Sequence, residues 1–379
     1  MQIDFSQYSY LPCLQCSEAE QIAYAKLSEE DKNAILPIFE LSQVKYEAAL
    51  EESVTAIAAL VSSRPFVIDL SKDRAPPPFV AVNNPDQGKI AKLQKAQDAY
   101  NKSLTSLLNA SDGFAEWRTL VGKFPNAVPV VQFTDPETQG KNILRQAVQL
   151  AKSGYDHLAI RITQETNEQI FPIVGQILAI LDSAAQLLVI IDCGQGRLQT
   201  SERAEFAKKA IARIIEEIEP SQAQHLSAVC LSDSYTTPGN AKLKLYESYS
   251  WQLWLEAREK FPFLFGDYGA NHRLKKANTF MPGEWKAQVV YPLDEAWIVY
   301  RHPDAQDANG WIEGSKEIKG DPSYDGACNC WGSELIDKAA VGDIIGATFA
   351  RFWHAAKINM HIHRRIGYSF EVMSGSDGP

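Results

Sequence analysis

The sequence predicts an α/β protein built on an eight-stranded (β/α)8 barrel, and three observations lead to this fold class. Short apolar runs, typical of parallel strands buried on both faces, occur eight times along the first 268 residues. A helix-compatible segment separates each run from the next. Most runs end in a polar side chain, and in such barrels the catalytic residues lie at these strand ends. An open doubly wound sheet is the alternative, because strand–helix alternation does not by itself establish closure.

The clearest strand is Leu187-Leu188-Val189-Ile190-Ile191, which ends at Asp192 and is followed by a glycine turn at Gly194 and Gly196. Its branched apolar residues favour a strand in the middle of a parallel sheet. The eight predicted strands span residues 8–13, 35–40, 66–70, 128–133, 157–162, 187–192, 226–232 and 263–268.

Local signals delimit the helices between these strands. Ser17 is suited to cap a helix that ends near Leu27, and Pro65 and Pro220 each follow the end of a helical pattern. A proline-rich segment, 71–87, is expected to form an exposed loop over the site. The predicted helices span residues 17–27, 43–60, 89–108, 113–121, 141–152, 168–182, 201–218 and 240–260.

The pattern changes after Tyr268. Residues 289–301 predict a β-hairpin with a turn at 292–295, followed by a Gly/Asp-rich loop over 304–326 and a helix over 334–352. We therefore predict three parts: a barrel over 1–285, a hairpin and helix packed on it over 286–366, and a flexible tail over 367–379.

Composition excludes several classes of protein. A net charge of −10 argues against nonspecific nucleic-acid binding, which depends on clustered Lys and Arg. The N-terminus lacks a signal-peptide pattern, and no apolar run is long enough to span a bilayer. Six cysteines in 379 residues do not form a disulfide framework. We expect a soluble cytoplasmic protein with no membrane partner; the oligomeric state is open.

Cofactor motifs are scarce. The sequence contains neither a P-loop, nor a dinucleotide-binding glycine motif, nor a nucleophile elbow. Cys13 and Cys16 have C-x-x-C spacing and Cys328 and Cys330 form a second pair, but we favour reduced thiols over a zinc site because C-x-C is not a usual zinc spacing. His361 and His363 are placed on one face of a strand, either as a ligand contact or as part of a solvated basic patch.

The strand ends supply the candidate site. In a barrel these ends meet on one rim, so we expect carboxylates from four strands to lie near Arg161. Asp69, Asp192 and Asp267 are the candidate ligands of a divalent ion, Mg²⁺ or Mn²⁺. The alternative is that these residues have only a structural role, at the ends of strands or as helix caps. The candidate catalytic set is Glu40, Asp69, Asp192 and Asp267, and the candidate substrate-binding set is Arg161, Tyr268, Tyr291, Trp297, Tyr300, Arg301 and His361.

Several spaced motifs resemble the beta protein family of phages and bacteria. They are Tyr10-Leu11-Pro12, residues 34–41, the hairpin motif Glu295-Ala296-Trp297-Ile298-Val299-Tyr300-Arg301, Cys330-Trp331-Gly332, and residues 358–362. The resemblance covers roughly residues 8–366. It implies a barrel protein without an assigned activity, found in mobile or defence-related settings. Glu40, Trp297, Tyr300, Arg301 and His361 match motif positions, whereas Ser333 stands where relatives tend to carry an acidic residue.

Two functions from different classes remain open. In the first, the carboxylates and a metal hydrolyse a phosphoester or nucleotide-like substrate whose anionic group Arg161 and Arg301 clamp. In the second, the barrel is a non-catalytic sensor or inhibitor in antiphage defence that recognises a small ligand or protein through exposed aromatic residues of the hairpin. Convergent acids in a cavity favour the enzyme, and an exposed aromatic patch favours the binding protein.

Overall fold

The protein folds as the predicted α/β barrel. The computed structural model describes residues 3–42, 50–72, 87–194, 199–233, 242–271, 286–304 and 308–373. Eight parallel strands form one sheet in the order β4-β3-β2-β1-β9-β7-β6-β5. They are β1 (Leu11–Leu14), β2 (Ile38–Leu41), β3 (Phe66–Leu70), β4 (Ala127–Pro129), β5 (Leu158–Thr163), β6 (Leu187–Asp192), β7 (Ser227–Ser232) and β9 (Leu264–Asp267).

The sheet closes between its two ends. Val130, just beyond β4, forms a parallel bridge with Ala159 of β5, and the Val131 amide donates to the Ala159 carbonyl at 2.8 Å. Closure decides against the open sheet and brings all eight strand ends to one rim.

Alternate side chains along each strand enter the barrel. The inner ones, such as Val67, Ile190 and Leu231, form one buried cluster that also contains Phe5 of the 3₁₀ helix η1 (Phe5–Gln7). The Ile3 amide donates to His157 immediately before β5, so this N-terminal segment lies at the strands' starting end. Apolar packing thus fills that end, and the polar side chains gather at the opposite one.

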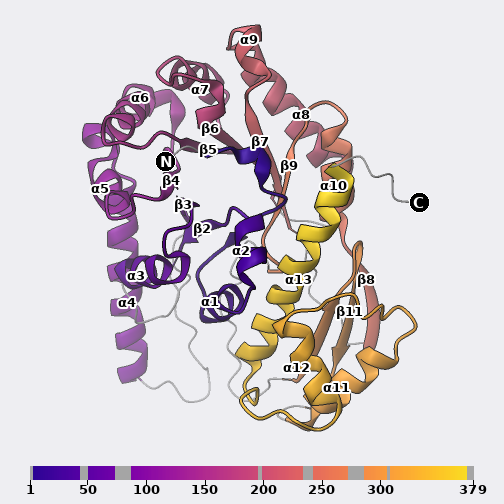
Figure 1. The fold of residues 1–379 in the computed structure, drawn as a ribbon. Helices are drawn as coiled ribbons and strands as arrows, with labels where there is room; N and C mark the ends of the chain where they lie inside the picture. The colour runs from indigo at the N-terminus through magenta and orange to yellow at the C-terminus, as the bar shows by residue number, and fades with distance from the viewer. Residues whose placement is uncertain are drawn as a thin grey trace.

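Helices surround the barrel, with a short 3₁₀ helix η2 (Ala184–Gln186) before β6 (Figure 1). Local caps fix several of their starts: Ser17 and Glu20 form a capping box, and Asp135 caps α6. The helices are α1 (Glu18–Ala25), α2 (Glu29–Ala34), α3 (Leu50–Val61), α4 (Gln87–Leu107), α5 (Ser111–Val121), α6 (Pro136–Lys152), α7 (Ile170–Leu178), α8 (Thr200–Glu216), α9 (Pro220–Ala223) and α10 (Tyr249–Arg258).

A three-stranded antiparallel sheet stands beside the barrel. It has the order β10-β11-β8, and β10 (Gln288–Pro292) and β11 (Ala296–Arg301) are the predicted hairpin. Helices α11 (Asn309–Gly320) and α12 (Trp331–Ala340) pack near it. Helix α13 (Ala350–Met373) then returns to the barrel, contacting α1 and α2 on one side and β10 on another (Figure 1). It takes the place of the eighth barrel helix.

Three elements predicted between residues 240 and 352 are wrong. Residues 240–260 are not one helix: β8 (Leu243–Glu247) pairs with β11 before α10 begins. Pairing with an existing hairpin overrides the helical pattern there. The predicted loop over 304–326 contains α11. The predicted helix over 334–352 is instead the end of α12, a turn with positive φ at Gly342 and Gly346, and the start of α13.

The C-terminal segment is helical where a strand was predicted. His361 and His363 lie in α13, and their side chains reach different partners, Asp267 and Asp31. Residues 367–373 also belong to this helix rather than to a tail. The predicted loop over 71–87, except for its first two residues and its last, and residues 374–379 lie outside the described part. The predicted division at residue 285 stays a prediction. Among the described helices, none combines the length and apolar character needed to cross a membrane.

Close packing of α12 on α13 leads to a first prediction. A Cβ at Gly332 would lie 2.5 Å from the Ala356 carbonyl oxygen and 2.7 Å from Met360 Cγ. Gly332→Ala is therefore expected to lower the free energy of unfolding by about 1–3 kcal/mol, the usual effect of overpacking. Urea denaturation measures this change. The control is Gly320→Ala, since a Cβ at Gly320 meets nothing within 4 Å; equal stability of the two variants would contradict the packing described.

Candidate functional site

Arg161 lies at the centre of a buried polar cluster inside the barrel. Its Nη1 is 2.7 Å from Asp69 Oδ2 and 3.5 Å from Glu40 Oε2, and its Nε is 3.3 Å from Asp192 Oδ2. Its Nη2 contacts the Tyr268 hydroxyl at 3.1 Å and Cys13 Sγ at 3.6 Å. We call these six residues the Arg161 cluster. Five strand positions and the residue after β9 thus converge, and all of them except Cys13 belong to the site predicted from the sequence.

Sheet register explains this convergence. Glu40 and Asp69 are paired positions of β2 and β3, so both enter the barrel at one level. Gln132, which follows the neighbouring strand β4, donates a hydrogen bond through Nε2 to Asp69 Oδ1 at 3.0 Å. Asp69 also accepts from the Leu70 amide at 2.7 Å. Two strands and an amide side chain therefore fix where these carboxylates point.

The cluster's electrostatics follow from burial and from the charge of Arg161. Burial would lower the pKa of Arg161, but the neighbouring Tyr268, Glu40 and Asp192 raise it well above its ordinary value. Burial raises the pKa of the Cys13 thiol, against the opposing effect of Arg161. Burial likewise raises the pKa of Tyr268. The cluster thus holds a permanent cation, a neutral thiol and a neutral phenol beside three carboxyl groups.

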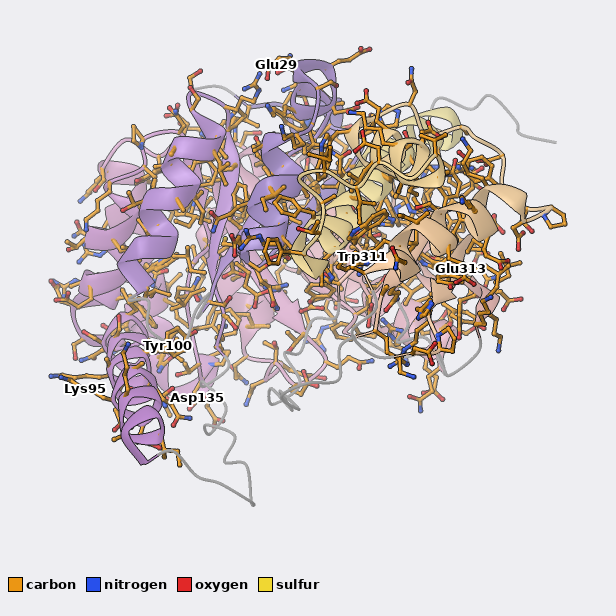
Figure 2. The ribbon with its side chains drawn as sticks, turned by 90° about the horizontal axis from the view of Figure 1, so that it is seen from below. Glu29, Lys95, Tyr100, Asp135, Trp311 and Glu313 are labelled. Atoms are coloured by element: carbon orange, nitrogen blue, oxygen red, sulfur yellow. The ribbon has the colours of Figure 1, made fainter. Side chains whose placement is uncertain are left out.

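A pocket of about 510 Å³ opens beside this cluster, and we call it the mouth pocket. Glu40, Asp69 and Arg161 line it from inside the barrel. Its other lining residues follow β3, β4 and β5 and include Lys72, Phe133, Thr134, Asp135, Thr163, Glu165, Thr166 and Asn167. Figure 2 shows Asp135 on the side of the molecule opposite Glu313 of α11. A cavity at this end of a barrel is the usual place for ligand binding.

Asp267 does not belong to this site, which corrects the sequence interpretation. It accepts hydrogen bonds from the Tyr10 hydroxyl and the Gly269 amide through Oδ1, and it lies 2.8 Å from His361 Nε2 through Oδ2. These partners place it toward α13, on the outer side of the barrel. A one-residue shift along β9 explains the error, because Tyr268 points inward and Asp267 therefore points outward.

Asp267 belongs to a second cluster, in which Trp297 stacks on His361 with 4.8 Å between ring centroids and Arg365 lies nearby. We call Asp267, Tyr10, His361, Trp297 and Arg365 the Asp267 cluster. Burial would raise the pKa of Asp267, but His361 and Arg365 lower it below its ordinary value. Burial lowers the pKa of His361 despite the nearby carboxylate. His361 and Asp267 are fully buried, so the cluster joins α13 to the barrel.

The hairpin aromatics are also buried. Tyr291, Trp297 and Tyr300 are at most 1% exposed, so the predicted exposed aromatic recognition surface is wrong. Tyr291 donates to Asp325 at 2.8 Å, and Tyr300 packs against Gly314. Arg301 lies in β11, and its amide donates to the Lys242 carbonyl. Neither the hairpin aromatics nor Arg301 lines the mouth pocket.

The predicted metal ligands do not come together. Asp69 and Asp192 face Arg161, whose guanidinium occupies the space between their carboxylates, whereas Asp267 lies outside the barrel. Within the described ranges, no group of three or more His, Cys, Asp or Glu side chains is arranged to hold a metal ion. The described cysteines form no disulfide bond.

Comparison with known proteins assigns the chain to a family. The family model described as "Beta protein" matches residues 10–367, which include every strand of the barrel and most of α13. The chain belongs to the beta protein family. It is also 24% identical to "Protein beta" of Enterobacteria phage P4, over all of this chain and 98% of that protein.

The matched region of this beta family chain contains both clusters. Its motif position Glu40 faces the mouth pocket, whereas the motif positions Trp297 and His361 lie in the Asp267 cluster. The resemblance led us to expect an acidic residue at the position of Ser333. Ser333 instead helps to cap the start of α12, since its hydroxyl donates to the Cys330 carbonyl and accepts from the Cys330 amide. Its place is therefore structural in this beta family member.

The sequence interpretation missed several site residues. Cys13 was considered only as an ordinary reduced thiol or a zinc ligand, and Lys72, Phe133 and Glu165 were not named as pocket residues. Their positions just after predicted strands were the available signal.

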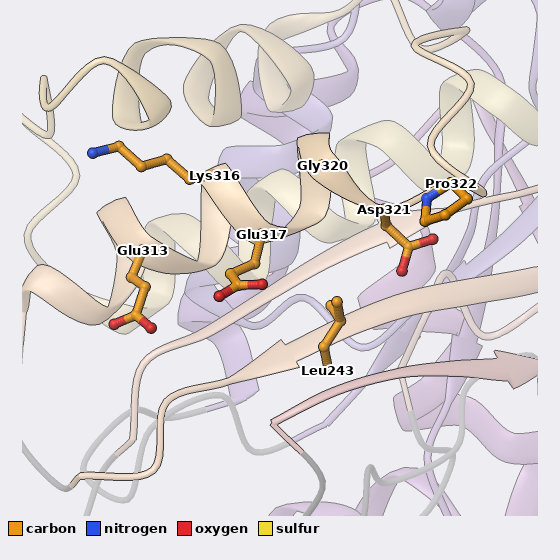
Figure 3. A pocket seen from close by; sticks show the side chains of 7 residues that line it. All are labelled: Leu243, Glu313, Lys316, Glu317, Gly320, Asp321 and Pro322. Carbon is orange, nitrogen blue, oxygen red and sulfur yellow. The ribbon is translucent and has the colours of Figure 1, made fainter.

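A second, shallower hollow of about 370 Å³ lies between α11 and β8, where Glu313, Glu317 and Asp321 face Leu243 (Figure 3). Lys242 pairs with Glu313 at 2.6 Å there.

Buried Lys357 of α13 gives a pH-dependent prediction. Burial lowers its pKa to about 7, against the raising effect of Glu20 and Asp233. The unfolded chain keeps the lysine protonated up to roughly pH 10, so the folded state binds fewer protons between these values. The free energy of unfolding of the native chain, relative to Lys357→Met, should therefore rise above pH 7 by about 1 kcal/mol per pH unit. Urea titrations at pH 7, 8 and 9 measure this difference. Parallel curves would contradict the expected pKa.

Proposed function

We propose that this protein is a hydrolase that acts on a small polar molecule in the mouth pocket, with Glu40 and Asp69 as its reacting carboxylates. The observation that carries the proposal is their common position: both approach one nitrogen of Arg161 and both line the cavity. Paired carboxylates from neighbouring strands, at the end of a barrel that carries catalysis, suit acid–base or nucleophilic chemistry.

Different contacts suggest different roles for the two carboxylates. Asp69 is held by Arg161, Gln132 and a backbone amide, all within 3.0 Å, which suits a positioning group. Glu40 lies farther from Arg161, at 3.5 Å, and we assign it the general base or nucleophile. Arg161 would hold both carboxylates in place, and Thr163, Thr166 and Asn167 would bond polar groups of the substrate.

Glu40→Gln tests this function. Phosphoesters, nucleotides, glycosides and amides are incubated with the purified chain, with and without Mg²⁺ or Mn²⁺, and product is measured. Loss of the base should lower kcat by about 10²–10⁴-fold. Glu116→Gln, an exposed change on α5 away from the pocket, is the control. Equal turnover by native chain and Glu40→Gln would end the assignment of Glu40.

A second candidate is a sensor or inhibitor that binds a ligand without turnover. Its support is that each guanidinium nitrogen of Arg161 already lies within 3.3 Å of a protein side-chain oxygen, so the guanidinium is engaged by the protein before any substrate arrives. A role in phage–host conflict rests on the phage origin of the similar protein alone. Saturable binding without product favours this candidate. Unchanged phage plaque counts on cells that express the chain would remove the proposed setting.

A further inference from the structure

We infer that the ligand of the mouth pocket carries a cationic nitrogen, as an ammonium, amidinium or guanidinium group, rather than a free phosphate or carboxylate. The inference rests on the proposed function in that it concerns the same cavity, and it names the class of substrate or ligand. It replaces the anionic substrate that the sequence suggested, in which Arg161 and Arg301 acted as a clamp.

Charge around the pocket is the first support. Four carboxylates line it, Glu40, Asp69, Asp135 and Glu165, against the two cations Lys72 and Arg161. Arg161 is turned toward the carboxylates within the barrel and also contacts Asp192. A pocket with this surplus of negative charge attracts cations and repels unaccompanied anions.

An aromatic face inside the pocket is the second support. The ammonium of Lys72 lies 4.2 Å from the ring centroid of Phe133, and both residues line the cavity. A cation at this distance is attracted by the electron-rich ring face. The position of the Lys72 ammonium thus shows where the pocket suits a positive charge. A cationic ligand would compete with Lys72 for the Phe133 ring and the nearby carboxylates.

A buried acceptor next to the pocket is the third support. Gln132 is fully buried, and its Nε2 donates to Asp69 Oδ1 and to the Val130 carbonyl. Both partners are acceptors, so the amide orientation is fixed and Oε1 must accept. Among the described residues, Oε1 has no donor within hydrogen-bonding distance. Gln132 does not itself line the cavity, but it bonds to Asp69, which does. A buried acceptor is costly to leave unpaired, so a ligand that brings N–H groups past Asp69 would be favoured.

Calorimetry with defined probes tests the inference. Agmatine, which carries one ammonium and one guanidinium group, is titrated at low ionic strength beside inorganic phosphate and AMP. We expect agmatine to bind and the two anions not to bind. Lys72→Met should tighten agmatine binding by about three- to tenfold, because it removes a like charge, and Glu165→Gln should weaken it by a similar factor. Lys152→Met, at the far end of α6, is the control and should change nothing.

The sign of the Lys72→Met effect decides between ligand classes. A pocket for anions would bind phosphate or AMP, and Lys72→Met would then weaken binding; that result, or no agmatine binding at millimolar concentration, overturns the inference. Failure of the proposed function looks different. Agmatine binding with no turnover of any substrate by the native chain leaves the ligand class standing and removes the hydrolase, whereas turnover that depends on Glu40 without cation binding does the reverse.

Discussion

Replacing Arg161 by methionine is expected to lower the free energy of unfolding by about 3–5 kcal/mol, because it leaves buried carboxylates without their counter-ion. Arg161 is 8% exposed and contacts Glu40, Asp69 and Asp192. Methionine fills a similar length of the barrel interior, so the loss reports mainly on charge rather than on a cavity. Chemical denaturation monitored by tryptophan fluorescence measures the change.

The matched control is Arg213→Met. Arg213 lies on the surface of α8 and pairs with Glu168 at 3.3 Å, with 42% of its side chain exposed. An exposed ion pair contributes about 0–1 kcal/mol, so this variant should stay close to the native chain. A loss below about 1 kcal/mol for Arg161→Met would mean that the carboxylates do not depend on the guanidinium, and the geometry of the Arg161 cluster would be wrong.

The sequence predicted the strand ends well because the signal is local. Each strand of the barrel is a short apolar run, and a carboxylate or arginine near its end can be located by counting along that run. Glu40, Asp69, Arg161 and Asp192 were placed correctly at the barrel mouth for this reason. Closure itself was not determined by the sequence, since the bridge between Val130 and Ala159 joins segments that no local pattern relates.

The direction in which a side chain points was harder to predict than its position. In a strand buried on both faces, apolar residues occupy both sides, so the sequence does not reveal which residues face inward. Tyr268 and Asp267 are neighbours in sequence and face opposite sides of the barrel wall. The pairing of β8 with β11 and the return of α13 depend on contacts between distant segments, which alternation within one segment cannot show.

Asp267→Ala is expected to be as destabilising as the loss of Arg161, by about 3–5 kcal/mol. It removes one acceptor from three buried donors, the Tyr10 hydroxyl, the Gly269 amide and the His361 ring. It also removes a negative charge that favours the ionised form of buried Arg365. Asp337→Ala, which breaks the exposed pair with Lys319, is the control and should cost less than about 1 kcal/mol.

The effect of Asp267→Ala should depend on pH with a definite sign. The pKa of Asp267 is lowered in the folded chain, so the carboxylate contributes its stability above its ordinary pKa, roughly 4, and loses it as the pH falls through the folded value. The deficit of the variant should therefore be full at pH 7 and shrink in acid. A constant deficit would show that lost packing, rather than lost charge, is responsible.

The same variant separates the two clusters by function. If Asp267 only joins α13 to the barrel, the folded fraction of Asp267→Ala keeps its ligand binding and turnover, while Glu40→Gln keeps its stability and loses turnover. Both variants are assayed at a temperature where Asp267→Ala is folded by circular dichroism. Loss of turnover in the folded Asp267→Ala chain would return Asp267 to the catalytic set. Asp267 would then act through its sequence neighbour Tyr268, which belongs to the Arg161 cluster.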